Sequence, residues 1–333
     1  MSPSNVQPDF LPSASLEMLA FRAVLLKRLR AFFDSRGFLE VETPLLSHDV
    51  VVDRHLDPLS VTLFADPREP QVGPKLWLQT SPEFAMKRLL VAGKGQLGAI
   101  YQVTRAFRGG EIGPLHNPEF TMVEWYRTGD DYAAGMQLLA DLADEMLGLG
   151  APERLTYREA FVRYAGVDPL DVRRGSPDPA GTTDRRPPDS SLDHDLHLDL
   201  DLLLTQKVEP HLGQSRPTIL YDYPASQSAL ARVRQGNPPV AERFELYVRG
   251  IELANGYHEL LDPAVLRERN GRNNVLRQSD GKQPLPEESR LLAAMDLGLP
   301  SCSGCALGFD RLVMATTGAK TIQEVMAFPI ERA

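Results

Sequence analysis

Three separate segments of the sequence carry residues that suit a bound nucleotide phosphate. In the first, Arg108 follows an apolar run, a loop with Gly109 and Gly110 comes next, and Phe120 begins a second apolar run. An arginine at the end of a strand can bind a phosphate through two parallel hydrogen bonds. An aromatic side chain nearby can stack on a purine. On its own this segment is weak evidence, because an exposed arginine is more often solvated or paired with a carboxylate.

The other two segments lie later in the chain. Small residues at 304, 306 and 308 are followed by Arg311, which we place in the first turn of a helix. An arginine there opposes the helix dipole, so a bound anion would explain it; tight packing with a surface arginine is the alternative. Glu252 and Glu259 flank an Asn-Gly pair, and two such carboxylates can share Mg²⁺, although a polar turn is also possible.

Cys302 and Cys305 are the two cysteines, and their C-x-x-C spacing is also found in redox and zinc sites. A structural zinc site needs four ligands, and no second pair completes one here. The residues around them are small and apolar. We therefore expect two buried, structural thiols.

The elements that must position these residues alternate between helix and strand. Apolar residues recur at helical spacing from Leu16 to Phe33, with Ser15 as the cap and Gly37 after the end. A second and a third helix are expected at 83–92 and 133–149. Strands are expected at 38–43, 75–80, 99–107, 118–126, 217–221 and 243–252. The short connections between strands favour an α+β fold, with a mainly antiparallel sheet flanked by helices.

Composition bounds the class of protein. Of 333 residues, 42% are hydrophobic and 24% charged, which is ordinary for a globular protein. No long apolar run and no signal-peptide pattern occur, so we expect a cytoplasmic protein without a membrane segment. The net charge of −9 weakens the expectation of nucleic-acid binding. We expect a flexible leader at 1–15, one catalytic domain at 16–333, and a disordered insertion at about 171–195.

The order of these segments, with Gly37–Pro44 before them, resembles motifs 1, 2 and 3 of class II aminoacyl-tRNA synthetases. The amino-acid sequences of 116–126 and 242–247 are similar to those of the lysyl branch of this family. Within that branch the chain most resembles the freestanding paralogues that ligate (R)-β-lysine to elongation factor P. The residues that carry this likeness include 80–83, 86–93, 223–227, 250–256 and 302–304, with Ala306 where lysyl-tRNA synthetases usually have glycine.

The resemblance implies a two-step reaction that uses ATP and Mg²⁺. The carboxylate of (R)-β-lysine attacks the α-phosphate of ATP, and a lysine amine of elongation factor P then attacks the resulting adenylate. Arg108 and Arg311 would be catalytic and bind phosphates. The ATP site would also include Gly110, Asn117, Phe120, Glu252, Leu253 and Gly308. Mg²⁺ would be held by Glu252 and Glu259. The substrate pocket would be lined by Ser81, Pro82, Glu83, Tyr126 and Glu259.

Two further points follow from the resemblance. The family pattern after the motif 2 arginine is Arg-Asn-Glu, whereas Gly110 stands here at the glutamate position and Glu111 follows it. Motif 1 forms the dimer interface in this family, so a homodimer is expected. About fifteen residues precede the first helix, too few for the anticodon-binding β-barrel, so tRNA is not an expected partner. The alternatives are α-lysine as substrate, another acceptor, or a regulatory module without activity.

Overall fold

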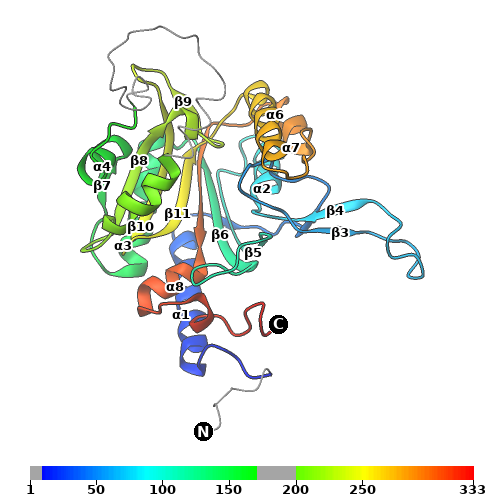
Figure 1. The fold of residues 1–333 in the computed structure, drawn as a ribbon, viewed down its shortest axis with the longest axis horizontal. Coiled ribbons are helices and arrows are strands. Elements are labelled where there is room, and N and C mark those ends of the chain that lie inside the picture. The colour runs from blue at the N-terminus through cyan, green and yellow to red at the C-terminus, as the bar shows by residue number, and fades with distance from the viewer. Residues whose placement is uncertain (1–9, 171–199) are drawn as a thin grey trace, which may run out of the picture. The chain divides into compact units, whose positions relative to one another are not determined.

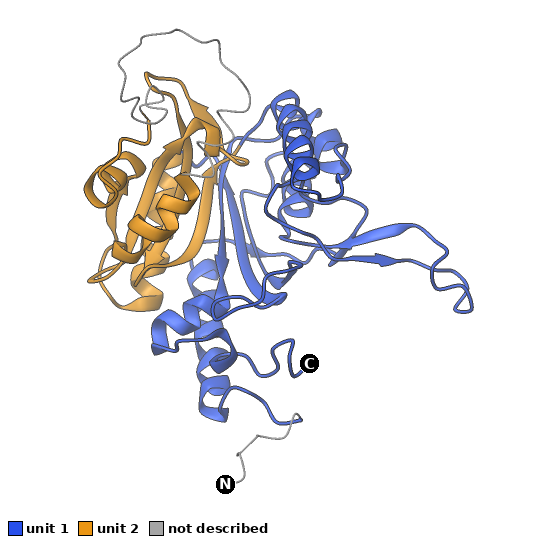
Figure 2. Ribbon diagram, in the orientation of Figure 1, with its two compact units in different colours: residues 1–131, 260–333 blue, residues 132–259 orange. Residues whose placement is uncertain are grey.

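The computed structural model describes residues 10–170 and 200–333, and the chain divides into two compact units (Figures 1 and 2). Unit 1 contains the described residues up to Asp131 together with Leu260–Ala333, and unit 2 is Tyr132–Glu259. The leader at 1–9 and the expected insertion at 171–195 lie outside the described residues. In the described part of the chain, no helix is both long enough and apolar enough to span a membrane.

Unit 1 is built on four neighbouring strands in the order β1-β5-β6-β12. The strands β1 and β5 are parallel, whereas β5–β6 and β6–β12 are antiparallel. A separate three-stranded sheet has the order β2-β4-β3. The elements of unit 1 are α1 (Leu16–Asp34), β1 (Leu39–Glu40), β2 (Leu46–Ser47), β3 (Ser60–Thr62), β4 (Lys75–Leu78), α2 (Glu83–Ala92), β5 (Ala99–Phe107), β6 (Glu119–Thr128), α6 (Pro263–Ser279), α7 (Arg290–Met295), β12 (Cys302–Gly308), α8 (Phe309–Thr317) and the 3₁₀ turn η4 (Ile322–Glu324).

Helix α1 covers one face of β5 and β6. The hydroxyl of Ser15 accepts a hydrogen bond from the N–H of Met18, as expected for the cap. Phe33 of this helix stacks on Tyr101 and packs against Trp125, with ring centroids 4.6 and 5.3 Å apart. Because side chains alternate along a strand, this aromatic packing leaves the opposite face of β5 and β6 for the functional residues.

Unit 2 has strands in the order β11-β10-β8-β7, with β9 beside β10. The pair β7–β8 is parallel, and the pairs β8–β10, β9–β10 and β10–β11 are antiparallel. The elements of unit 2 are α3 (Tyr132–Leu147), β7 (Glu153–Thr156), α4 (Tyr157–Tyr164), the π-turn η1 (Leu204–Val208), the 3₁₀ turns η2 (Glu209–His211) and η3 (Ala225–Gln227), β8 (Thr218–Pro224), β9 (Val233–Arg234), β10 (Val240–Val248) and β11 (Ile251–His258).

The expected α+β class with a mainly antiparallel sheet is confirmed, and one expected strand is wrong. The sequence suggested a single strand over 243–252, but the chain reverses at Arg249 and Gly250, which both have positive φ (52° and 76°). Two residues of that conformation form the tight turn that suits a β-hairpin. The segment therefore supplies the end of β10 and the start of β11.

The cysteine pair lies on β12, where neither thiol has a disulfide partner. Both Cys302 and Cys305 are buried, and they form no disulfide bond with each other. Three residues along a strand bring side chains to opposite faces, so this C-x-x-C pair does not close on itself. This geometry agrees with the expectation of structural thiols.

Candidate functional site

The loop after β5 carries the first predicted arginine. Strands β5 and β6 pair from Ala99 opposite Arg127 to Phe107 opposite Glu119, so the loop spans residues 108–118. The N–H of Arg108 donates to the carbonyl of Pro118 (2.9 Å), which closes the loop at its base. Arg108 thus lies at the strand end, as the sequence indicated.

The side chain of Arg108 lies beside the predicted adenine-stacking residue. Its guanidinium carbon is 5.1 Å from the ring centroid of Phe120. Its Nε donates to the carbonyl of Thr80 (3.4 Å), and one terminal nitrogen is 3.7 Å from the carboxylate of Glu111. Gly110 has φ +79°, a conformation that glycine adopts without strain, and it turns the chain so that Glu111 faces Arg108.

The second predicted arginine is held against the same loop. Gly308 caps α8 without a side-chain hydrogen bond, and Arg311 lies in the first turn. Nε of Arg311 donates to the carbonyl of Leu115 (3.3 Å), and a terminal nitrogen is 2.6 Å from Nε2 of His116. Burial, together with the positive charges of Arg311 and Arg108, lowers the pKa of His116. The neutral imidazole can therefore accept a hydrogen bond from Arg311.

Asn117 holds this loop in place through two hydrogen bonds. Its Nδ2 donates to the carbonyl of Glu119 (2.6 Å), and its Oδ1 accepts from the N–H of Ile330 (2.9 Å). An amide has two N–H donors, so these two bonds leave the second amide hydrogen for a nucleotide. Asn117 thus ties the loop to the C-terminal segment.

A polar row lies on the face of β6 opposite α1. Phe120, Glu124 and Tyr126 alternate along this face, and the hydroxyl of Tyr126 donates to Glu124 (2.5 Å). On β12 the small residues Gly304, Ala306 and Gly308 lie opposite Tyr126, Glu124 and Met122. The small side chains leave space beside a buried carboxylate. Glu124 was missed by the sequence reasoning, and its spacing of two from Tyr126 and four from Phe120 is the signal that could have found it.

The predicted substrate residues at 81–83 follow β4. Gln79 fixes this segment to β5, because its amide donates to Oγ1 of Thr104 (3.1 Å) and to the carbonyl of Arg105 (2.8 Å). Pro82 precedes α2, and Glu83 begins it. Glu83 is buried and forms an ion pair with Lys87, one helical turn later. The carboxylate that was expected to meet a substrate ammonium group is thus already paired with a lysine.

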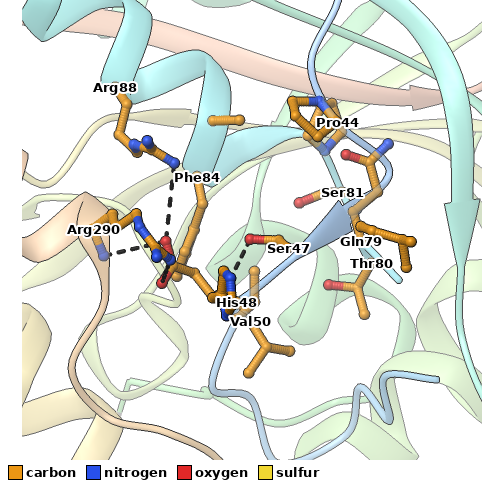
Figure 3. Close-up of a pocket in the computed structure, with 15 residues that line it drawn as sticks. Pro44, Ser47, His48, Val50, Gln79, Thr80, Ser81, Phe84, Arg88 and Arg290 are labelled. Carbon is orange, nitrogen blue, oxygen red and sulfur yellow. Dashed lines mark hydrogen bonds and ion pairs between the residues drawn. The ribbon is translucent and has the colours of Figure 1, made fainter. Parts of the chain in front are cut away.

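A pocket of about 270 Å³ borders this segment (Figure 3). Thr80 and Ser81 lie on one side, Pro82 is also part of the lining, and Arg88 and Arg290 both point toward the carboxylate of Asp49, at 3.9 and 3.2 Å. Oγ1 of Thr80 is buried and has no hydrogen-bond partner among the described residues. A buried hydroxyl normally has a partner, so the pocket can supply a polar ligand with a ready hydrogen bond.

In unit 2 the hairpin β10–β11 places the other predicted residues. Glu252 lies opposite Tyr247, and Asn255 opposite Glu245, with a register shift between residues 246 and 247. Because directly paired residues share a face, Glu245, Tyr247, Glu252 and Asn255 lie on the same side of the hairpin. The neighbouring Leu253 is buried, so a contact with nucleotide would use its backbone.

Glu252 and Glu259 are the predicted Mg²⁺ ligands, and their role with the metal stays a prediction. Glu252 is the second residue of β11, and Glu259 follows its end. Magnesium normally takes one or two protein carboxylates together with phosphate oxygens, so these carboxylates would act on the ion together with bound ATP. Within 10–170 and 200–333, no group of three or more His, Cys, Asp or Glu side chains could hold a metal ion. A magnesium ion that is bound together with ATP phosphates needs fewer protein ligands than such a group.

The model of the family described as tRNA synthetases class II (D, K and N) matches residues 9–332. The chain belongs to this family. Its catalytic domain therefore covers nearly the whole chain, and the arginine-bearing loop and α8 are parts of a class II synthetase domain. This is a family of ATP-dependent ligases that activate amino acids, and such enzymes generally use ATP and Mg²⁺.

Proposed function

We propose that this class II synthetase domain activates (R)-β-lysine with ATP and transfers it to a lysine side chain of elongation factor P. The observation that carries the ligase part is the meeting of two arginines at one loop. Arg108 lies beside Phe120, and Arg311 is bound to His116 of the same loop. Two guanidinium groups near an aromatic ring suit a purine nucleotide with its phosphates.

The first step requires alignment more than it requires a reactive side chain. A carboxylate oxygen of the amino acid forms a bond to the α-phosphorus, and the bond to pyrophosphate breaks. Arg108 would bind the α-phosphate and neutralise the charge that builds on its oxygens, while Arg311 would hold the γ-phosphate. Phe120 would fix the adenine.

The second step transfers the activated acyl group. The deprotonated amine of the acceptor lysine attacks the acyl carbon of the adenylate, AMP leaves, and the amine loses a proton as the amide forms. No covalent bond to this chain is required. The domain needs only to hold the adenylate and exclude water from it.

Selectivity for a diamino acid is supported by the polar row on β6. Glu124 is buried (2% exposed) and lies opposite Ala306, with Tyr126 donating to it. A buried carboxylate favours a substrate ammonium over a neutral group. The methyl group of Ala306, absent from a glycine, narrows the space beside this carboxylate. This geometry supports a diamino acid as substrate, and the choice of (R)-β-lysine and elongation factor P rests on the sequence of the motifs.

The deciding experiment measures pyrophosphate release from ATP with Mg²⁺. Purified protein is supplied with (R)-β-lysine, with α-lysine, or with no amino acid, each with and without elongation factor P. We expect the fastest release with (R)-β-lysine and transfer of its radiolabel to the factor. Release with α-lysine alone would redirect the proposal to that substrate. No release with any amino acid would refute the ligase function.

We further propose a homodimer through the motif 1 region. Apolar side chains of α1 and β1 are exposed, including Leu16, Val24 and Leu39, which are 53–75% exposed. A second copy would cover these residues. Sedimentation at micromolar concentration tests this proposal, and a monomer there would refute it.

A further inference from the structure

A short loop at 53–57 is bound tightly to the C-terminal end of α6. Arg277 of α6 donates to the carbonyls of Asp53 (2.8 Å) and Leu56 (3.0 Å) and to the carboxylate of Asp57 (3.0 Å). Lys282 donates to the same carboxylate (2.7 Å) and to the carbonyl of Arg54 (3.0 Å). The loop is therefore held through both its backbone and its side chains.

A third contact closes this arrangement. The guanidinium of Arg54 forms two parallel bonds to the carboxylate of Asp280, at 2.7 and 2.8 Å. Inside the loop, the carboxylate of Asp53 accepts from the N–H groups of His55 and Leu56. We call the five charged residues Arg54, Asp57, Arg277, Asp280 and Lys282 the α6 clamp.

The clamp is stabilised by burial and by hydrogen bonds to its charged groups. Arg277 is only 4% exposed, and its Nε also donates to the carbonyl of Gln283 (3.1 Å). A buried arginine is costly unless its donors are satisfied, and four hydrogen bonds use most of the five N–H donors of Arg277. Burial raises the pKa of Asp57, but the hydrogen bonds and charges of Lys282 and Arg277 outweigh this and lower it overall. Asp57 therefore stays ionised in its clamp.

The loop at 53–57 is hydrogen-bonded to the loop that carries Arg108. The carbonyl of Asp57 accepts a hydrogen bond of 2.6 Å from the N–H of Gly109, the residue after Arg108. A Cβ atom at Gly109 would lie 3.2 Å from that carbonyl oxygen and 3.3 Å from a methyl carbon of Leu59. Glycine at 109 thus permits the close approach of the two backbones.

We propose that the α6 clamp positions Arg108 for the α-phosphate, acting through the Asp57 carbonyl and the Gly109 N–H. Asp57, Arg277 and Lys282 are positioning residues in this inference, because no described contact joins them to Arg108 itself. The inference rests on the proposed function for the role of Arg108. The bond between residues 57 and 109 exists independently of that role, and this allows the two ideas to be tested apart.

The test compares Asp57→Asn with a control variant on α6, the helix that carries Arg277. Asp57→Asn keeps the backbone carbonyl but weakens its anchorage to Arg277 and Lys282. Asp57 is partly exposed, so the variant is expected to fold. The control, Arg267→Met, removes an arginine of α6 that pairs with Glu288 and Asp296 instead. Residue-resolved hydrogen exchange of the Gly109 amide and the kinetics of pyrophosphate release are measured for both.

We expect faster exchange at Gly109 and a fall of about 10- to 100-fold in kcat/KM for ATP in Asp57→Asn, the range that a misplaced catalytic group produces. The KM for the amino acid should stay unchanged, which general loss of structure would not allow. Arg267→Met should match the wild type in both measurements. Unchanged exchange at Gly109 would overturn the inference, and so would faster exchange with wild-type kinetics.

The outcome is also decisive if the wild type proves inactive with every amino acid. The proposed function then fails, and the Kd for ATP, measured by calorimetry, takes the place of kinetics. Weaker ATP binding by Asp57→Asn than by Arg267→Met would support positioning of Arg108. Equal affinities would overturn it.

Discussion

The buried pair of Glu83 and Lys87 allows a quantitative prediction about unit 1. Lys87 is 2% exposed and Glu83 8%, and the two lie one turn apart at the start of α2. The ammonium of Lys87 is also 5.7 Å from the ring centroid of Tyr126. Replacing Lys87 with methionine keeps the packing volume but leaves the carboxylate of Glu83 buried beside an apolar chain.

The expected cost can be worked out from this geometry. Breaking a buried ion pair by removing one partner costs about 3–5 kcal/mol in unfolding free energy. Glu83 lies in the first turn of α2, where the helix dipole stabilises a carboxylate by about 0.3–1 kcal/mol. The loss for Lys87→Met should therefore lie near the lower end, about 3 kcal/mol. In the double variant with Glu83→Gln the loss should shrink, because no charge remains buried.

Urea denaturation of the two single variants and the double variant measures these terms. The chain offers a matched control, since Glu268 and Arg272 form an ion pair with the same spacing on α6 but are 70% and 67% exposed. Arg272→Met should cost about 0.5 kcal/mol or less. The reasoning would be refuted if Lys87→Met lost no more stability than Arg272→Met, or if the double variant lost the sum of both single changes.

Three further outcomes are expected. The pKa of His116 lies below its ordinary value of 6.5, so the folded chain binds this proton less readily than the unfolded chain. The free energy of unfolding should therefore fall as the pH drops below 6.5. His116→Asn should make this fall with pH less steep, as measured by urea titrations at several pH values. Ala306→Gly should change the ratio of kcat/KM for (R)-β-lysine over α-lysine by about 10-fold or more, in favour of α-lysine, as one methyl group in a pocket can. Asp310 accepts from the N–H of Thr121 and pairs with Arg22, so Asp310→Asn should lower the unfolding free energy by about 3 kcal/mol, measured in urea.

Local signals predicted several elements well. Helix α2 begins and ends at the expected residues 83 and 92, and β5 spans 99–107 as expected. Ser15 caps α1, and Gly37 follows its end with φ +76°. In each case the information lies within a few residues of the element, because capping, helical spacing and chain reversal are local properties.

The hairpin at Arg249 shows where local signals fail. Gly250 marks a turn, but arginine seldom adopts positive φ, so a single strand over 243–252 was the simpler interpretation. Strand β11 therefore begins at Ile251, and Glu252 is its second residue. The pairing of Glu83 with Lys87 was likewise invisible, because the spacing i to i+4 occurs on exposed and buried helix faces alike.

The motifs identify the residues that contact a nucleotide, but the residues that hold those motifs in place lie elsewhere in the sequence. Helix α6 is rich in arginine and asparagine and would be interpreted as a solvated helix, yet Asn270, Asn274 and Arg277 are buried. Asn270 and Asn274 donate to carbonyls at 287 and 285, and Arg277 donates to those at 53 and 56. A helix that binds backbone carbonyls needs a polar buried face, so an apolar periodicity cannot reveal it. Gly109 is a trace of this contact inside the motif, since a Cβ atom there would be crowded by the carbonyl of Asp57 and by the side chain of Leu59.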